Sequence, residues 1–109
     1  MNHTASKKVK HAIREYAGQL YEADLHKELE TLSAKFDEWR NGTLDSFDLQ
    51  EAIHQFHNGA ARELFKHYNS ELDFVVAQAI VDGRINQAEV PVEVLEHLRN
   101  AIAFFKGQQ

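Results

Sequence analysis

Two histidines and one glutamate form the sequence's clearest metal-ligand pattern. Glu51, His54 and His57 follow one another at intervals of three residues. On an α-helix this spacing places the three side chains on neighbouring positions of one face, and imidazole and carboxylate groups are suitable ligands for a transition metal. A Glu-x-x-His motif is one quarter of the di-iron pattern of four-helix bundles, which needs the motif twice and two further Glu. Because the sequence holds the motif once, it predicts at most a transition-metal site that other residues must complete.

The helix that carries these residues assigns different environments to its histidines. On a helical wheel centred on Ala60, His67 falls about 20° from the centre, His57 about 60° and His54 about 120°. We therefore expect His67 to be buried and neutral, His57 to lie at the boundary of the core, and His54 to face water or a partner. The alternative for His57 is a boundary histidine with ordinary hydrogen bonds and no metal.

Other kinds of active site lack their residues. The 109 residues contain no Cys, which excludes disulfides, thiolate metal sites and cysteine nucleophiles. No two of the five Gly are close enough to form a phosphate-binding loop, and no serine has a glycine elbow around it. We therefore lean towards a protein that is not an enzyme and expect no cofactor, a transition metal ion being the one option.

Charge and hydropathy limit the partners. Seventeen acids against twelve bases give a net charge of −5 at pH 7, and the chain also has seven His. Four bases precede the first acid, so the chain after residue 14 carries −9, which makes nucleic acid an unlikely partner. The longest mostly apolar run, Phe74 to Val81, is far shorter than the roughly 20 residues that cross a bilayer. We expect no membrane association and a cytoplasmic location.

Two linkers share one pattern, running from Asn41 to Leu49 and from Asp82 to Val90. Each reads as Asn or Asp, Gly, any residue, an aliphatic residue, Asp or Asn, two residues, an acid and an aliphatic residue. This pattern resembles the rear half of an EF-hand loop. The second linker also resembles a turn of tellurite-resistance TerB-like helical domains. That resemblance covers nine residues, and no kinship is inferred from it. Trp and Ile occupy position three of the two loops and cannot bind calcium. A helix that ends on Gly, a buried aliphatic residue and a capped helix explain the same pattern.

The spacing of apolar residues predicts an all-α fold, a small bundle of four or five helices joined by short Gly-containing linkers. From Ser6 to residue 40 the pattern allows one long helix that rotates its apolar face, or a break near residues 21 to 24. The next helix is expected to run through Gly59, with a bend at that residue as one form, because its apolar phase continues. The segment Leu72 to Asp82 is apolar on every face and is the predicted central helix. Four further residues are predicted core: Trp39, Phe56, Leu64 and Ile80.

The expected function is that of a small soluble interaction or regulatory protein, with a homodimer as one form. We expect residues 1–109 to form a single helical domain with flexible ends at 1–6 and 107–109. The partner is a protein or another copy of the chain. The apolar stripe of the first helix changes register between Leu20 and Leu25, so the residues on either side of the change form two faces. We expect at least one of these faces to stay uncovered by the chain's own core. The residues that form them are Tyr16, Leu20, Tyr21 and Leu25. The alternative is a metal-binding or metal-dependent catalytic bundle that uses the Glu51 motif.

Overall fold

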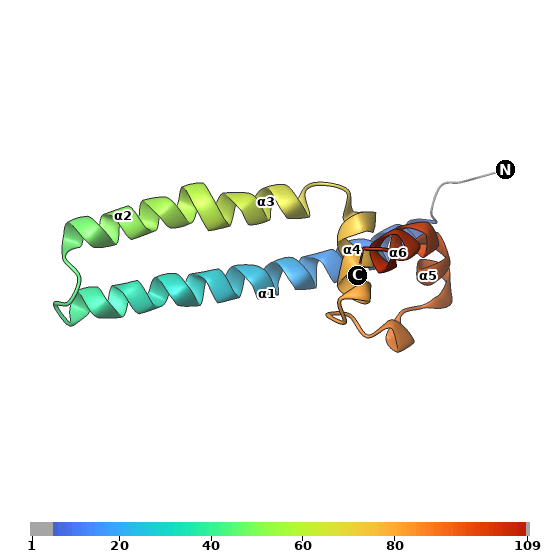
Figure 1. Ribbon diagram of the computed structural model, residues 1–109, viewed down its shortest axis with the longest axis horizontal. Coiled ribbons are helices and arrows are strands. Elements are labelled where there is room, and N and C mark those ends of the chain that lie inside the picture. Colours follow the sequence, from blue (N-terminus) through green and yellow to red (C-terminus); the bar gives the residue numbers. More distant parts are fainter. Residues whose placement is uncertain (1–5, 109) are drawn as a thin grey trace. The chain divides into compact units, whose positions relative to one another are not determined.

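The computed structural model describes residues 6–108, and these are helical with no strand among them, as the sequence predicts. The helices are α1 (Lys7–Arg40), α2 (Ser46–Phe56), α3 (Arg62–Tyr68), α4 (Leu72–Val81), α5 (Val92–His97) and α6 (Arg99–Lys106) (Figure 1). A π-helical turn, η1 (His57–Ala61), joins α2 to α3, and a 3-10 turn, η2 (Gln87–Glu89), precedes α5. The contacts of the chain group into two compact units. Of the predicted flexible ends, residues 1–5 and 109 lie outside the described part, and a single domain stays a prediction.

One unit comprises the described residues 6–19 and 68–108, and its core surrounds α4. Val76 and Ala77 of α4 have no exposed surface, and Leu98, which separates α5 from α6, is 1% exposed. Because α4 is apolar on every face, it is covered from several sides, and the prediction of a central helix is confirmed along with that of a buried Ile80. The predicted last helix is interrupted at Leu98, where α5 ends and α6 begins.

The other unit, residues 20–67, is a helical hairpin. The later part of α1 runs antiparallel to the continuous stretch of α2, η1 and α3 (Figure 1). Among the described residues of this hairpin only Leu20 and Leu49 are buried, at 7% and 6% exposure. Phe56 and Leu64, both predicted as core, are only half-buried. Trp39 is 41% exposed, which corrects its prediction as core, and its Nε1 donates a hydrogen bond to Ser46 Oγ at 3.0 Å.

Helix α1 is unbroken over 34 residues, so the first of the two sequence alternatives holds. Its buried residues in the first half are Val9, Ile13, Ala17 and Leu20. The five-residue step from Leu20 to Leu25 falls where α1 passes from one unit to the other. The change of register therefore reflects two different packing environments along one helix.

The two similar linkers have the same backbone geometry. Gly42 and Gly83 adopt φ values of +79° and +81°. In the first linker Thr43 N donates to Glu38 O (2.9 Å) and Gly42 N to Trp39 O (3.1 Å), and the equivalent bonds of the second run from Arg84 to Ala79 and from Gly83 to Ile80. These are Schellman helix ends, in which the left-handed residue is most often Gly. Leu44 and Ile85, expected to be buried, are half-buried, and they belong to different units.

Both linkers then start a new helical segment with a side-chain cap. Asp45 Oδ1 accepts from Asp48 N at 2.8 Å, and Asn86 Oδ1 accepts from Ala88 N at 3.1 Å. Each cap satisfies one amide of a helix start that has no partner within the helix. The shared sequence pattern is thus a repeated helix stop followed by a helix start.

Candidate functional site

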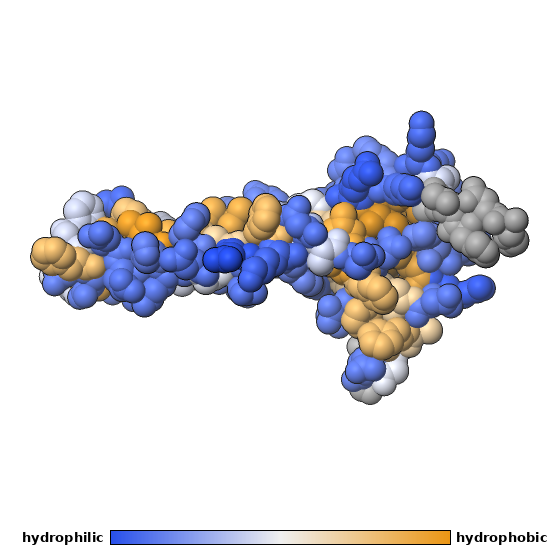
Figure 2. All heavy atoms as spheres, turned by 90° about the horizontal axis from the view of Figure 1, so that it is seen from above, coloured by the Kyte–Doolittle hydropathy of each residue, from blue (hydrophilic) through white to orange (hydrophobic). Residues whose placement is uncertain are grey.

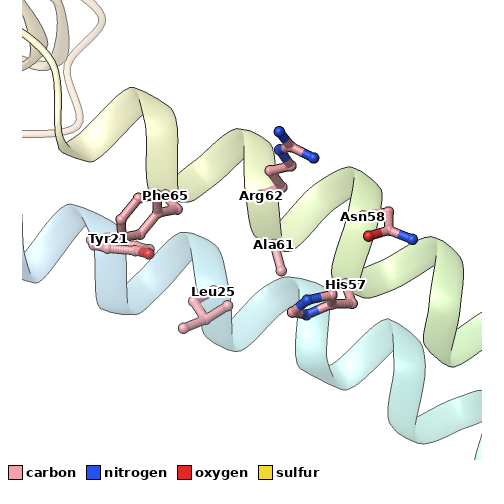
Figure 3. A pocket seen from close by; sticks show the side chains of 7 residues that line it. All are labelled: Tyr21, Leu25, His57, Asn58, Ala61, Arg62 and Phe65. Carbon is pink, nitrogen blue, oxygen red and sulfur yellow. The ribbon is translucent and has the colours of Figure 1, made fainter.

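A groove of about 460 Å³ lies on one face of the hairpin, between α1 and the helix opposite (Figure 3). Tyr21 and Leu25 line it from α1, and the opposite helix contributes five residues: His57, Asn58, Ala61, Arg62 and Phe65. Figure 3 shows the rings of Tyr21 and Phe65 turned toward each other at one end and the imidazole of His57 at the other. Arg62 is the one Asp, Glu, Lys or Arg residue among those that line the groove. The groove is therefore mainly apolar, with one cationic side chain at its rim.

The π turn supplies small residues to the hairpin. Gly59, Ala60 and Ala61 follow each other in it, and of these Ala61 lines this groove while Ala60 lines the two grooves of the opposite face. A π turn contains more residues per turn than an α-helix and occurs in helices as a local widening, often at functional sites. The prediction that the helix continues through Gly59 is confirmed, and the π turn is the local irregularity at that place.

The opposite face of the hairpin is more highly charged. It has two grooves, of about 230 and 440 Å³. Half-buried apolar side chains such as Leu32, Phe56 and Leu64 contribute to these grooves. Five charged residues line one or both of them: Asp24, Lys27, Glu28, Lys35 and Glu63. Charged groups of both signs keep this face hydrated, so the face with the single charge is the better candidate for contact with an apolar partner.

Large apolar side chains are exposed on the hairpin (Figure 2). Phe47 is 82% exposed and Phe65 59%, while Leu29 and Ile53 are 46% and 40% exposed. Leu29 follows the groove residue Leu25 by one helical turn. Such a concentration of exposed apolar residues on a small unit is typical of an interaction surface.

Phe47 and Phe65 were not among the predicted site residues, although the sequence holds a signal for them. Both fall outside the apolar stripe that runs from Leu49 through Phe56 and Leu64 to Tyr68. A large aromatic residue outside such a stripe is the sequence signal of a side chain that the neighbouring helix does not fully cover.

The structure places the predicted histidines as follows. His54 is exposed, as expected, and His57 is exposed while lining the groove. His67 is exposed as well, so the prediction of a buried neutral histidine is wrong. The residues buried or half-buried after the π turn are Leu64 and Tyr68, and His67 lies about 80° from the centre of that pair. The stripe had been extrapolated from Ala60 with regular α-helical geometry, which the π turn does not follow.

The described residues do not bring the predicted metal ligands into a metal-binding group. Glu51 is exposed, and its Oε1 lies 3.4 Å from Gln55 Nε2. Within residues 6–108 no group of three or more His, Cys, Asp or Glu side chains is arranged to hold a metal ion. A metal site at Glu51, His54 and His57 therefore stays a prediction.

Comparisons with known proteins give no further guide to the groove. No family model, curated protein or solved structure matches the chain. In the part of the chain that the structure describes, no helix is long and apolar enough to cross a membrane. The function must therefore be argued from the surface of the hairpin itself.

Proposed function

We propose that the protein is a non-enzymatic interaction module whose hairpin receives an apolar helix of a protein partner in the groove lined by Leu25, His57 and Phe65. The observation that carries the proposal is how little of the hairpin's apolar surface is buried. Two of its residues are buried, while Phe47, Phe65, Leu29 and Ile53 stay 40–82% exposed. A cytoplasmic location belongs to the same proposal and is compatible with the cysteine-free sequence.

The physical reason is the geometry of two helices. Two packed helices shield each other along one line of contact, so the flanks of each apolar stripe stay in water. A third and fourth helix cover those flanks in a bundle. Fully burying a side chain such as Leu or Phe contributes about 1.5–3 kcal/mol relative to leaving it exposed. Covering the exposed part of Phe65 and Leu29 would therefore stabilise a complex substantially.

The arrangement favours a helical partner in the groove. An amphipathic helix presents apolar side chains at positions i, i+3 or i+4 and i+7 to such a groove. The Arg62 guanidinium on the rim would pair with an acidic residue at the edge of that helix. The lining residues include no Ser, Cys, Asp or Glu that could act with His57 as a catalytic pair, which supports binding over catalysis.

The test is a selection from a library of amphipathic helical peptides displayed against the full chain. We expect peptides with apolar anchors at helical spacing, and their affinity should fall at least tenfold, about 1.4 kcal/mol, on Phe65→Glu. The matched control is Phe104→Glu, because Phe104 is 55% exposed against 59% for Phe65 and lies in the other unit. Its substitution should leave affinity within about twofold, or roughly 0.4 kcal/mol.

Two outcomes would contradict the proposal. One is a selection that enriches no helical peptide. The other is peptides that bind equally well to the wild type and to Phe65→Glu, since their site would then lie outside the groove.

A further inference from the structure

We infer that a second groove, on the unit built around α4, binds an acidic amphipathic helix of a protein partner through the cations Arg99 and Lys106. This groove has a volume of about 370 Å³ and is lined by residues of α5 and α6 and by Gln87 of η2. It shares no residue with the hairpin groove. The inference therefore goes beyond the proposed function and does not depend on it.

The walls of this groove are two regular helical rows. The lining residues of α6 stand at positions i, i+3, i+4 and i+7 of one α-helix: Arg99, Ile102, Ala103 and Lys106. Those of α5 stand at i, i+3 and i+4: Val92, Leu95 and Glu96. Rows of this spacing form the ridges of a helix surface, and the groove between two ridges accepts the side chains of another helix.

The groove offers aliphatic surface to an occupant. Ile102 is 8% exposed and Leu95 is half-buried, whereas Val92 at the start of α5 is 68% exposed. The small side chain of Ala103 is exposed, which lets a neighbouring helix approach α6 closely. Aliphatic side chains of a partner would remove this surface from water, which favours binding.

Two cations determine the charge of the occupant. Arg99 and Lys106 are exposed, and neither side chain forms an ion pair or hydrogen bond with another described residue. At 1.5 Å per residue they stand about 10 Å apart along α6. Two carboxylates at positions i and i+7 of a partner helix have the same separation, and a guanidinium binds a carboxylate through two parallel hydrogen bonds. The partner helix therefore needs an acid at i and i+7 and apolar residues at i+3 and i+4.

The charge of the rest of this unit does not oppose an acidic partner. Residues 6–19 and 68–108 carry seven acids and seven bases, whereas residues 20–67 carry ten acids and five bases. An acidic segment is thus repelled by the hairpin and not by this unit. Within the groove, Glu96 lies on the α5 wall, so the acids of the partner belong along α6.

The partner is a different protein, because this chain lacks the required pattern. None of the helices in the described residues 6–108 has acids at i and i+7 with apolar residues at both i+3 and i+4. A second copy of the chain could therefore not place two carboxylates opposite Arg99 and Lys106 from one helix.

The first experiment uses a synthetic helix of about 15 residues, near the length at which an isolated helix becomes marginally stable. Its centre holds Glu, two spacers, two Leu, two spacers and Glu, an order that reads the same in both directions and so assumes no orientation. Binding to the full chain is measured by calorimetry in salt of about 0.15 M, which screens the distant charges of the hairpin. We expect saturable binding. A probe with Lys in place of both Glu should bind at least tenfold more weakly, about 1.4 kcal/mol.

The second experiment reverses the charges of the groove. The double variant Arg99→Glu, Lys106→Glu should bind the Glu probe at least tenfold more weakly and the Lys probe more tightly than the wild type does. The matched control is Lys7→Glu, Lys8→Glu, the same change at two exposed cations of the same unit that lie outside the groove. Its affinity for the Glu probe should stay within about twofold, roughly 0.4 kcal/mol.

Two further measurements separate the groove from other effects. Helicity is recorded for each variant because Lys106 lies in the last turn of α6, where an acid is unfavourable, and Lys106→Gln replaces Lys106→Glu if helicity falls. Phe65→Glu, the variant that tests the hairpin groove, should leave affinity for the Glu probe within about twofold. The two grooves can therefore fail independently.

Four results would overturn the inference. The first is a Glu probe that does not bind at about 1 mM, an affinity below about 4 kcal/mol. The second is binding that the double charge reversal leaves unchanged. The third is a small anionic amphiphile, decanoate, that displaces the probe and binds more tightly, because the occupant would then be a small molecule. The fourth is a dimer of the wild-type chain that the double charge reversal dissociates, because a second copy would then occupy the groove.

Discussion

Glycine at the end of α4 offers a test of how much the repeated linker contributes to stability. Gly83 has a φ of +81°, and a Cβ added there would meet no atom within 4 Å. An L-residue in this left-handed conformation is disfavoured by about 1–2 kcal/mol because its Cβ approaches the following carbonyl oxygen. Since no neighbour is displaced, Gly83→Ala should destabilise the unit by about 1 kcal/mol through the backbone alone.

The matched control is Gly18→Ala, because Gly18 lies in α1, in the same unit, and is equally free of neighbours. Alanine is favoured over glycine inside a helix by about 0.5–1 kcal/mol, so this variant should gain stability. The two identical substitutions should thus differ by about 1.5–2 kcal/mol and have opposite signs.

Hydrogen exchange at the amides of Val76 and Val94 measures the opening of this unit independently of the hairpin. Thermal unfolding followed by circular dichroism gives a second reading, with a shift of about 4 °C per kcal/mol for a chain of this size. A Gly83→Ala variant within about 0.3 kcal/mol of the wild type would refute the argument that the positive φ requires glycine.

Two further outcomes are expected. His97→Ala should lower the free energy of unfolding by about 0.5–1.5 kcal/mol, because it removes the 2.8 Å contact of His97 Nε2 with Asp73 Oδ2 that joins α5 to α4. The control His26→Ala, at an exposed pair within one helix, should lower it by less than about 0.5 kcal/mol. Urea unfolding measures both variants. Calcium should change neither melting temperature nor helicity, and a rise of several degrees would contradict the reading of the linkers as helix caps.

The fold could be predicted from the sequence wherever a local pattern determines the structure. The apolar composition of α4 requires cover on every side, and Val76 has no exposed surface. Gly42 and Gly83 follow helices and precede a capping Asp or Asn, and both linkers have that geometry. These features depend on a few adjacent residues, which the sequence shows directly.

The candidate site was harder to predict because it depends on what covers each helix. Periodicity identified Phe56 and Leu64 as facing another helix, but not that only one helix is there to cover them. The same limit explains the exposed Trp39, whose indole bonds to Ser46 across the end of the hairpin. His67 was misplaced by regular geometry carried through a π turn, which the sequence Asn58-Gly59-Ala60 does not reveal.

The contrast between the two units carries the functional argument. Both are built from helices with similar apolar periodicity, yet Val76 in one unit is wholly buried and the best-buried residue of the hairpin, Leu49, retains 6% exposure. Several helices converge on α4, whereas the hairpin has two layers. A hairpin that needed only to be stable could place a polar residue at Phe47, whose side chain is 82% exposed. An aromatic ring at 82% exposure gains most of its burial free energy only when another surface covers it, and this supports the proposed interaction surface on the hairpin.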